Sequence, residues 1–304
     1  MIRILVSILV YNGDDRTIRT ISDICGQECD GVNVGIVIID NCSTNGISDR
    51  IAESFPWLKI IRTQSNLGYA GGHNLAIELA LKAGVDFLFV LNDDIEIPQS
   101  YIQTMVNEGK RHLDAAALGT TICLPDGKIQ AVYGYFGPLY AGVKWCNVKS
   151  SASHESVKEV DVVQGAAIVL TKKALRRGFK FDEQLFFGCE EYDLGCWAKS
   201  ESLKIYVLEH IEVIHNTSQK QTVLDRWHLD LFSNYYGTRN SIYIKKKYSR
   251  SYLEFVISVA YAFLRSTIKG IVFFFKGYPS FIRYAIKAIY DGLTKRMGMS
   301  PDGF

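Results

Sequence analysis

Three polar residues, Asn92, Asp93 and Asp94, follow directly on the strongly apolar run 87–91. The run predicts a buried strand, so two adjacent carboxylates should lie at its carboxyl end. Two like charges side by side are unfavourable unless a positive group lies near them. Carboxylate oxygens suit Mg²⁺ or Mn²⁺, which commonly bridge to phosphates. A capping turn before Pro98 would explain the same residues, so the other strand ends have to decide.

Polar residues also follow two earlier apolar runs, Ile2–Val10 and Val32–Asp40. Parallel strands end at one edge of a sheet, and ligands gather at that edge. The Asp40 carboxylate could accept the imide N–H of a uracil or thymine ring, and an Asx-type turn is the alternative. The candidate binding residues at these strand ends are Tyr11, Asn12, Asp40 and Asn41.

The stretch SNLGYAGGHN, residues 65–74, is a glycine-rich turn that leads into a predicted helix. The backbone N–H groups of such a turn, together with the helix N-terminus, favour an anionic phosphate or allow a nucleoside to approach closely. The stretch has neither the GxGxxG nor the P-loop pattern, so by itself it is weak evidence for a nucleotide site.

A second acidic group crowds the start of another predicted helix, in the stretch FFGCEEYDLGCW. Its members are Glu190, Glu191 and Asp193. Acidic residues in a first turn complement the helix dipole, which is a purely structural explanation. A crowded and partly desolvated carboxylate also has a raised proton affinity, which suits a general base working near neutral pH.

Two further residues have both a structural and a chemical interpretation. His215 follows a short apolar run, where a lone histidine is usually structural, although imidazole is also an acceptable ligand for Mn²⁺. Arg239 and Asn240 belong to NYYGTRN, on a predicted amphipathic helix whose basic end is solvated.

Strands and helices alternate over the first third of the chain, which predicts an α/β fold with a largely parallel sheet. Residues 114–156 predict short strands and loops, and the chain is mostly helical from Val223 to about Arg296. The predicted strands are Ile2–Val10, Val32–Asp40, 57–63, 85–91 and 203–208. The predicted helices are one through Ile18, Ile21 and Cys25 capped by Asn12 or Asp14, then Gly68–Ala83, 97–110 entered through Pro98, 171–177 and Glu190–Ser200.

Composition narrows the class of protein. The 304 residues carry 34 Lys and Arg against 32 Asp and Glu, a balance that suggests no bulk affinity for nucleic acid. Seven scattered cysteines without a CxxC pair fit a reducing cytoplasm rather than a disulfide framework or structural zinc site. The apolar N-terminus is short and broken by Ser7, so we expect a first strand rather than a signal peptide. No uncharged apolar run reaches 18 residues, so we expect no clear transmembrane span.

The region after Tyr252 interleaves aromatic and aliphatic residues with cations. This pattern suits helices that lie in a membrane interface. An aromatic core or an oligomer interface, with Lys and Arg side chains extended to solvent, is the alternative. The cations are Arg265, Lys269, Lys276, Arg283 and Lys287.

Taken in order, VSILVYN, IIDNCSTNG, NLGYAGGHN and VLNDDIEI resemble the motifs of family 2 glycosyltransferases of the GT-A fold. The resemblance covers about the first 245 residues, and the later part resembles bacterial rhamnosyltransferase-like members. It implies a Rossmann-like, mostly parallel central sheet flanked by helices. We expect a GT-A domain over 1–248, with a nucleotide-binding half to about 112 and an acceptor half over 113–248, and a helical, basic and aromatic C-terminal region over 249–304.

The resemblance also implies roles for single residues. Asp94 ends the family's DxD motif and would hold the metal, with His215 completing the shell. Asn92 would contact ribose directly or through water, and Asp93 would face solvent. The residues implied to hold the nucleoside and pyrophosphate are Tyr11, Asn12, Asp40, Asn41, Asn66, Gly68, Tyr69, Asn74, Asn92 and Asp93.

In the family's ED motif the second acidic residue is the general base. It maps to Glu191, where Glu replaces the usual Asp, with Glu190 as the fallback and Asp193 beside them at the phosphate or acceptor. Rhamnosyltransferase-like relatives share a YYxxRN pattern, which implies that Arg239 holds a diphosphate through paired hydrogen bonds.

The implied protein is an inverting, Mn²⁺- or Mg²⁺-dependent enzyme that transfers a sugar from a nucleotide-diphosphate donor during cell-surface polysaccharide synthesis. The favoured donor is dTDP-rhamnose, with UDP-hexose or UDP-galactofuranose open. The expected acceptor is a saccharide on a polyprenyl diphosphate. We expect a cytoplasmic protein on the inner face of the bacterial plasma membrane, with a homo-oligomer possible and no nucleic-acid partner.

Two other classes of protein remain. A sugar nucleotidyltransferase would carry a glycine-rich Arg and Lys signature near the first strand, and this chain does not. A non-catalytic nucleotide-binding protein would need Asp40 and could dispense with Glu190, Glu191 and His215, all of which are present.

Overall fold

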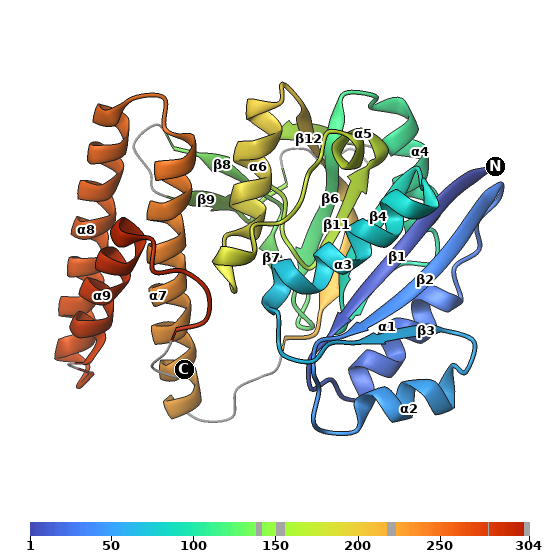
Figure 1. Ribbon diagram of the computed structural model, residues 1–304, viewed down its shortest axis with the longest axis horizontal. Coiled ribbons are helices and arrows are strands. Elements are labelled where there is room, and N and C mark those ends of the chain that lie inside the picture. Colours follow the sequence, from blue (N-terminus) through green and yellow to red (C-terminus); the bar gives the residue numbers. More distant parts are fainter. Residues whose placement is uncertain (138–141, 150–155, 218–222, 279, 301–304) are drawn as a thin grey trace. The chain divides into compact units, whose positions relative to one another are not determined.

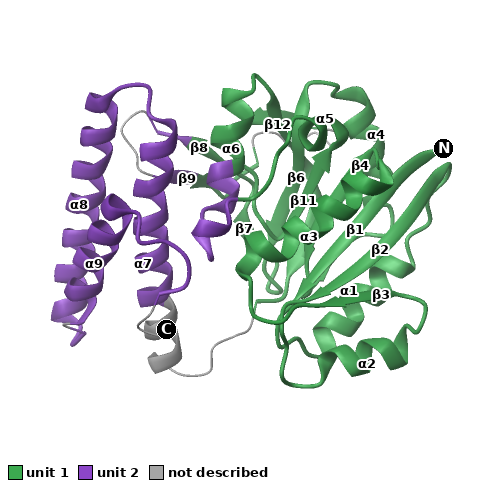
Figure 2. Ribbon diagram, in the orientation of Figure 1, with its two compact units in different colours: residues 1–135, 145–181, 194–217 green, residues 136–144, 182–193, 218–304 purple. Residues whose placement is uncertain are grey.

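The computed structural model describes residues 1–137, 142–149, 156–217, 223–278 and 280–300 (Figure 1). The chain divides into two compact units (Figure 2). Unit 1 comprises Met1–Tyr135, Trp145–Phe181 and Leu194–Thr217, and unit 2 comprises Phe136–Lys144, Asp182–Asp193 and Ser218–Phe304. The domain boundaries expected from the sequence, 1–248 and 249–304, stay a prediction.

Unit 1 is built on one sheet whose strands follow the order β10-β12-β6-β11-β4-β1-β2-β3, with β5 paired to β12 and β7 paired to β6. Strands β3, β2, β1 and β4 are parallel. Because β11 is antiparallel to both β4 and β6, strands β6 and β12 run in the same direction as β4. The predicted α/β fold with a mostly parallel sheet is confirmed.

The strands are β1 (Ile2–Val10), β2 (Val32–Asp40), β3 (Lys59–Arg62), β4 (Phe87–Asn92), β5 (Ile95–Glu96), β6 (Ala115–Cys123), β7 (Ile129–Ala131), β8 (Tyr133–Phe136), β9 (Val143–Cys146), β10 (Val157–Val160), β11 (Ala167–Thr171) and β12 (Lys204–His215). The helices are α1 (Asp15–Cys25), α2 (Ile47–Ser54), α3 (Gly68–Ala83), α4 (Tyr101–Arg111), α5 (Lys172–Arg176), the 3-10 helix η1 (Glu183–Leu185), α6 (Glu190–Ser200), α7 (Val223–Tyr248), α8 (Tyr252–Phe275) and α9 (Ser280–Thr294).

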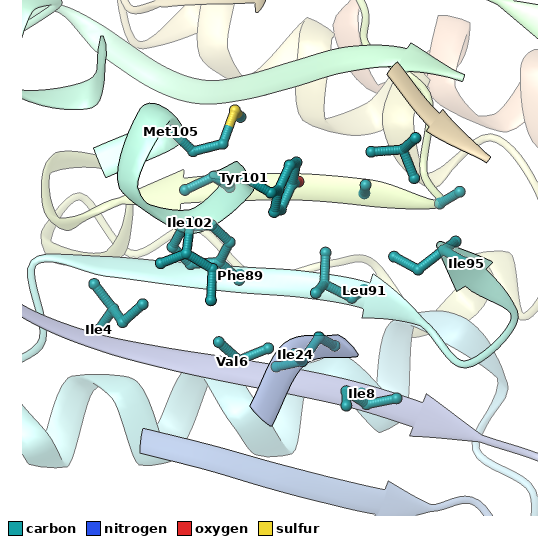
Figure 3. Packing of buried hydrophobic residues seen from close by; sticks show 14 of the residues in the cluster. Ile4, Val6, Ile8, Ile24, Phe89, Leu91, Ile95, Tyr101, Ile102 and Met105 are labelled. Carbon is teal, nitrogen blue, oxygen red and sulfur yellow. The ribbon is translucent and has the colours of Figure 1, made fainter. Parts of the chain in front are cut away.

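Both faces of the unit 1 sheet are covered by helices, which β1 shows most clearly. Successive side chains of a strand point to opposite faces. Ile4, Val6 and Ile8 pack with apolar residues of α1, α2 and α4 (Figure 3). Leu5 and Leu9 pack on the other face, with residues of α3, α5 and the later part of α6. A strand buried on both faces needs a continuous apolar sequence, and this is why β1 could be predicted.

Helix α3 begins and ends where the sequence predicts, whereas the predicted start of α4 is wrong. Helix α4 begins at Tyr101 with Ser100 at its N-cap. Pro98 lies before the helix, where its carbonyl oxygen accepts the Tyr101 N–H at 3.0 Å. Pro98 therefore opens a turn that leads into the helix.

Two strands differ from the prediction. Strand β6 is a fully buried central strand inside the region expected to hold only short strands and loops. Its sequence, AAALGTTIC, is composed mostly of small and hydroxyl residues that suit close packing: a Cβ on Gly119 would lie 2.4 Å from the Val163 Cβ. Strand β12 extends to His215 because a register shift between Leu208 and Glu212 lets it continue past a polar segment.

Unit 2 contains the long helices α7, α8 and α9, which confirms the helical region predicted from Val223 onward. The buried residues of α8 are four small side chains, each one turn from the next. A Cβ on the last of them would lie 3.0 Å from Cγ1 of Ile282 on α9, so the two helices approach closely. The four residues are Ser258, Ala262, Ser266 and Gly270.

Within the part of the chain that the structure describes, α8 is the one helix long and apolar enough to cross a membrane. It contains Glu254, Arg265 and Lys269, which is why no uncharged run of 18 residues occurs in its sequence. Length and composition alone are weak evidence for a membrane span.

Candidate functional site

The carboxyl ends of β1, β2 and β4 lie side by side at one edge of the unit 1 sheet. The parallel register pairs Val10 with Asp40, and Leu9 with Asn92. Tyr11 and Asn12, which follow β1, are both exposed at this edge. The edge therefore carries the polar residues that the sequence predicts to lie together.

The Asp40 carboxylate is fully buried and is already hydrogen-bonded. One of its oxygens, Oδ1, accepts the Ser43 N–H at 2.8 Å, and Oδ2 accepts from the Ser48 hydroxyl and from Arg62 Nε. Burial alone would raise the pKa of Asp40, but the hydrogen bonds from Ser43 and Ser48 and the charge of Arg62 lower it below its usual value. In this structure Asp40 shapes the loop after β2 and does not present an acceptor to a base.

Asn41 and Asn66 hold the loop that leads into α3. The Asn41 amide nitrogen donates to Asn66 Oδ1 and to the Gly68 carbonyl, at 2.9 and 3.0 Å. The Gly68 N–H in turn donates to Asn66 Oδ1, and Gly68 has a φ of 71°, a left-handed conformation that suits glycine. These predicted nucleotide ligands have structural partners within the loop itself.

The other predicted residues of α3 are also used in packing. Asn74 is buried and forms two hydrogen bonds with the Phe181 backbone, so the predicted contact of its side chain with nucleotide is wrong for this structure. A Cβ on Gly72 would lie 2.3 Å from Leu9, so this glycine lets α3 approach β1 rather than a phosphate. Tyr69 is half-buried and donates its hydroxyl to the Gly165 carbonyl at 2.9 Å.

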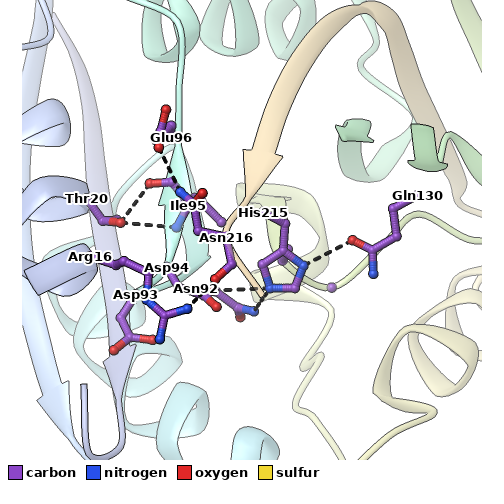
Figure 4. Close-up of polar contacts among 12 residues, drawn as sticks. Arg16, Thr20, Asn92, Asp93, Asp94, Ile95, Glu96, Gln130, His215 and Asn216 are labelled. Carbon is purple, nitrogen blue, oxygen red and sulfur yellow. Dashed lines mark hydrogen bonds and ion pairs between the residues drawn. The ribbon is translucent and has the colours of Figure 1, made fainter. Parts of the chain in front are cut away.

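Asp94 and His215 meet at this edge although 121 positions separate them in the chain (Figure 4). Strand β5 pairs antiparallel with the end of β12, with Ile95 opposite His215. The Asn216 N–H also donates to the Asp94 carbonyl at 2.7 Å. As a result Asp94 Oδ1 lies 3.2 Å from His215 Nε2, with both side chains partly exposed.

Gln130 of β7 orients the His215 ring. Its Oε1 lies 3.2 Å from His215 Nδ1 and can accept an Nδ1–H, while Nε2 faces Asp94. The Asn92 amide nitrogen lies 3.3 Å from the same Nε2. Sequence reasoning missed Gln130, because an exposed glutamine in a short strand has no recognisable pattern.

The geometry of the Asp94 and His215 pair fits two ligands of one divalent cation. Ligands about 2.1 Å from a cation and at right angles to each other lie about 3 Å apart. Among the described residues no group of three or more His, Cys, Asp or Glu side chains could hold a metal. A cation at this pair would therefore take further oxygen ligands from water or from a bound phosphate.

Asp93 was expected to face solvent, but its side chain is bound within the site. It is half-buried and its Oδ2 accepts the Thr17 hydroxyl at 2.8 Å. Burial raises the pKa of Asp93 to about 7; the Thr17 hydrogen bond opposes this shift, and the charge of Asp94 adds to it. Arg16, which the sequence analysis also missed, forms an ion pair with Asp14. The hydrogen bond with Asp14 raises the pKa of Arg16, and the nearby charges of Asp94 and Asp93 add to this shift.

The predicted general bases lie in unit 2, at the start of α6. Glu190 is buried, and its Oε1 has no hydrogen-bond partner among the described residues. Burial raises the pKa of Glu190 to about 8, and the charge of Glu191 adds to the shift. With this pKa, Glu190 is mostly protonated at neutral pH. Glu191 is half-buried, whereas Glu190 is buried. Of the two, Glu191 is the more accessible carboxyl group.

Asp193 and Arg239, predicted to contact a phosphate or acceptor, are both buried in unit 2. Asp193 Oδ1 accepts from Lys247 Nζ at 2.9 Å, and burial raises the pKa of Asp193 although Lys247 opposes the shift. The Arg239 guanidinium donates to the carbonyls of Leu185 and Gly298. Both side chains are buried and bound within unit 2 in this structure, so that prediction is wrong for both.

Comparison with known proteins shows which family this chain resembles. Residues 5–139 match the family model described as glycosyl transferase family 2, over the region that holds the strand-end edge and the Asp94 turn. This part of the chain is therefore similar to a family 2 glycosyltransferase domain. The fold is GT-A, as the resemblance of the motifs implied.

A curated relative of this chain is the N-acetylglucosaminyl-diphospho-decaprenol L-rhamnosyltransferase of Mycobacterium tuberculosis. The two are 26% identical over 205 residues, which cover 60% of this chain and 66%, just under two thirds, of the relative's length. The rhamnosyltransferase-like resemblance is thereby supported.

Two solved structures share the fold of this chain. TarS of S. aureus, residues 1–349, is 14% identical, with a TM-score of 0.58 over 97% of this chain and 82% of that one. The mannosyltransferase PcManGT of Pyrobaculum calidifontis, solved with GDP-Man and Mn²⁺, is 13% identical, with a TM-score of 0.58 over 97% of this chain and 88% of that one.

Asp40→Asn tests the buried loop that follows β2. Both carboxylate oxygens of Asp40 accept hydrogen bonds, whereas an amide has only one acceptor oxygen. We therefore expect the free energy of unfolding at pH 7 to fall by about 1–3 kcal/mol. Because the pKa of Asp40 is lowered in the folded state, its contribution is complete above its ordinary pKa of about 3.9 and is lost as pH falls through the folded value. The difference from wild type should therefore shrink in strong acid.

Urea unfolding at pH 7 and in strong acid measures this effect. Asp49→Asn is the matched control, because Asp49 is exposed and its nearest cation is the same Arg62, at 3.7 Å. We expect a change within about 0.5 kcal/mol for that control. Equal losses in the two variants would contradict a special role of the buried carboxylate.

Proposed function

We propose that this protein is an inverting, metal-dependent glycosyltransferase that moves rhamnose from dTDP-rhamnose to a saccharide carried on a polyprenyl diphosphate. The observation that carries the proposal is the Asp94 and His215 pair at the carboxyl edge of the parallel sheet. The rhamnosyltransferase name of the curated relative supports the donor sugar and the lipid-linked acceptor. The Mn²⁺ and GDP-Man in the mannosyltransferase structure support a metal and a nucleotide-sugar donor.

Asp94 Oδ1 and His215 Nε2 would hold the cation. A divalent ion at this place supplies positive charge that stabilises a departing nucleoside diphosphate. Gln130 would accept the Nδ1–H of His215, which would leave Nε2 free for the cation. Asn92, 3.3 Å from the same nitrogen, would hold the ring on its other side or contact the ribose.

The nucleoside would lie against the exposed side chains that follow β1, Tyr11 and Asn12. Asn12 is fixed for this purpose: its N–H donates to Ser43 Oγ, and its Oδ1 accepts the Thr44 N–H, both at 2.9 Å. Asp40 would act through the same loop, because it holds the Ser43 N–H. Asp40, Asn41, Asn66 and Gly68 thus would shape the nucleotide site rather than touch the base.

Glu191 would act as the general base. It would take the proton of an acceptor hydroxyl as that oxygen attacks the anomeric carbon from the face opposite the diphosphate. The glycosidic bond forms as the bond to the diphosphate breaks, and a single displacement inverts the configuration. A protonated Glu190 cannot accept this proton at neutral pH.

Helix α8 would keep the enzyme at the membrane that carries its acceptor. The face of α8 opposite its four buried small residues is exposed and apolar. Cations, Arg265 and Lys269, lie along one flank, which complements anionic lipid headgroups. The exposed apolar residues of this face are Leu253, Ile257, Leu264, Ile268, Ile271 and Phe275.

The first prediction is that wild-type protein with Mn²⁺ releases nucleoside diphosphate from dTDP-rhamnose, in a panel that includes UDP-hexoses and UDP-galactofuranose. Asp94→Ala should abolish turnover and weaken Mn²⁺-dependent nucleotide binding in calorimetry, because one cation ligand is lost. Asp126→Ala, which removes an exposed carboxylate bound to Lys128, is the control and should behave as wild type. Full activity of the Asp94 variant would refute the metal role. If nucleoside diphosphate is released from one of the other donors and not from dTDP-rhamnose, that donor replaces dTDP-rhamnose in the proposal.

The second prediction separates the two adjacent glutamates. Glu191→Gln should retain donor binding and lose transfer by about 10²- to 10⁴-fold, since the amide cannot accept a proton. Glu190→Gln replaces a group that is neutral at pH 7 and should keep most of the activity. The reverse result, measured as kcat beside donor affinity, would show that Glu190 is the base.

The third prediction concerns membrane binding. Replacing Ile257, Leu264 and Ile268 by Glu should lower co-sedimentation with vesicles of anionic phospholipid about tenfold or more, because each buried apolar side chain contributes to partition. Leu113→Glu with Trp57→Glu, two exposed apolar residues of unit 1, is the control. The alternative outcome is that wild type does not bind vesicles and sediments as a dimer, while the triple variant sediments as a monomer. In that case the face is an oligomer interface.

A further inference from the structure

The loop before the two glutamates of unit 2 has an unfavourable backbone conformation. Phe186 has a φ of 59° and Cys189 a φ of 73°, and Gly188 between them has a φ of 77°. Left-handed backbone is disfavoured for residues that carry a Cβ, above all for a bulky one such as Phe. Such a loop persists only where surrounding groups hold it in place.

Asn240 of α7 supplies those groups. Its side-chain nitrogen, Nδ2, lies 3.0, 3.0 and 2.8 Å from the carbonyl oxygens of Leu185, Phe187 and Gly188. The side chain is fully buried. One amide group therefore binds three of the five residues of the loop, which we define as residues 185–189.

Arg239 fixes the orientation of Asn240 and adds a contact of its own. Its Nε donates to Asn240 Oδ1 at 2.9 Å, which turns the amide nitrogen toward the loop. Its Nη2 donates to the Leu185 carbonyl, also at 2.9 Å. The guanidinium lies 4.6 Å from the centre of the Tyr236 ring and is 1% exposed, so it is shielded from solvent.

The loop in turn holds the start of α6. The Cys189 carbonyl accepts the Asp193 N–H at 3.0 Å, in the first turn of the helix. The Gly188 N–H lies close enough to the Glu190 carboxyl to oppose the rise of its pKa. The contacts of Arg239 and Asn240 therefore fix the segment that directly precedes Glu190 and Glu191 in the chain.

We infer that Arg239 and Asn240 are positioning residues, which clamp loop 185–189 so that Glu191 is held in the geometry that proton transfer requires. This inference rests on the proposed function, in which Glu191 is the general base. Both residues belong to the YYxxRN segment. Because their side chains are buried and bound within unit 2, positioning takes the place of the diphosphate contact that the family resemblance implied.

Asn240→Asp tests the clamp with almost no change in shape. The variant replaces the donor nitrogen with a carboxylate oxygen facing three carbonyls, so the loop loses its hold. With dTDP-rhamnose, or whichever donor wild type uses, we expect kcat to fall about 10²-fold, since displacement of a catalytic group by about 1 Å has that effect. Donor affinity should change less than about twofold, because the strand-end residues of unit 1 are untouched.

Arg239→Lys is the second variant, because it keeps the charge and loses the fork of donors. Tyr235→Phe is the matched control: it lies on the same helix, is equally buried, and keeps the ring that packs near Phe186 and Arg239. It loses the 2.6 Å hydrogen bond from its hydroxyl to Asp291, which does not touch the loop backbone. We expect this control to lower the melting temperature and leave kcat per folded molecule unchanged.

The outcomes separate the two proposals. If wild type transfers no sugar from any donor, the proposed function fails. If wild type is active and the folded Asn240→Asp and Arg239→Lys proteins keep their kcat, the positioning role fails alone. If both variants cannot fold while Tyr235→Phe folds, the pair serves folding rather than positioning, and the inference is overturned.

Discussion

The short antiparallel pairing of β5 with the end of β12 is the constraint on which the candidate metal site depends. Neither Asp94 nor His215 is a site by itself, because each is a common residue at a strand end. The pairing sets Ile95 opposite His215, and the Asn216 N–H closes onto the Asp94 carbonyl. The two side chains then face each other at a separation that one cation would span, without any contribution from side-chain strain.

Unit 1 and unit 2 contain carboxylates in contrasting surroundings. Asp40 is buried with enough donors to stay ionised, and its pKa is lowered. Glu190 is buried with too few donors beside a like charge, and its pKa is raised. The difference follows from counting hydrogen-bond donors around each group. The first carboxylate serves to fix a loop, whereas the second leaves its half-buried neighbour, Glu191, as the proposed proton acceptor.

Much of the fold could be predicted because its elements have strong periodic signals. Strand β1 and helix α3 are examples, as is the polar edge that ends β1, β2 and β4. Strand β6 could not be predicted, because AAALGTTIC packs by being small rather than by being strongly apolar. The Asp94 and His215 pair was predicted through family resemblance. Its partner Gln130 was not, since the contact depends on the path of a short edge strand.

Predictions failed most often where a polar residue could serve either the ligand or the fold. Asn74, Asp193 and Arg239 were all expected to bind a ligand, and all are buried with partners inside their own unit. Residue type and spacing are the same in both cases. Only burial and the identity of the nearest donors decide between them, and neither can be read from a single sequence.

The register shift of β12 between Leu208 and Glu212 limits which insertions and deletions the chain can accept during evolution. Side chains of a strand alternate between faces, so the direction of His215 depends on whether an odd or even number of residues precedes it in register. Loss of a single residue at the bulge would turn the imidazole to the far side of the sheet while leaving every remaining amino acid intact. The placement of His215 beside Asp94 thus depends on the number of residues in β12 as well as on their chemistry, and insertions or deletions there should disturb the candidate metal site as much as loss of the histidine.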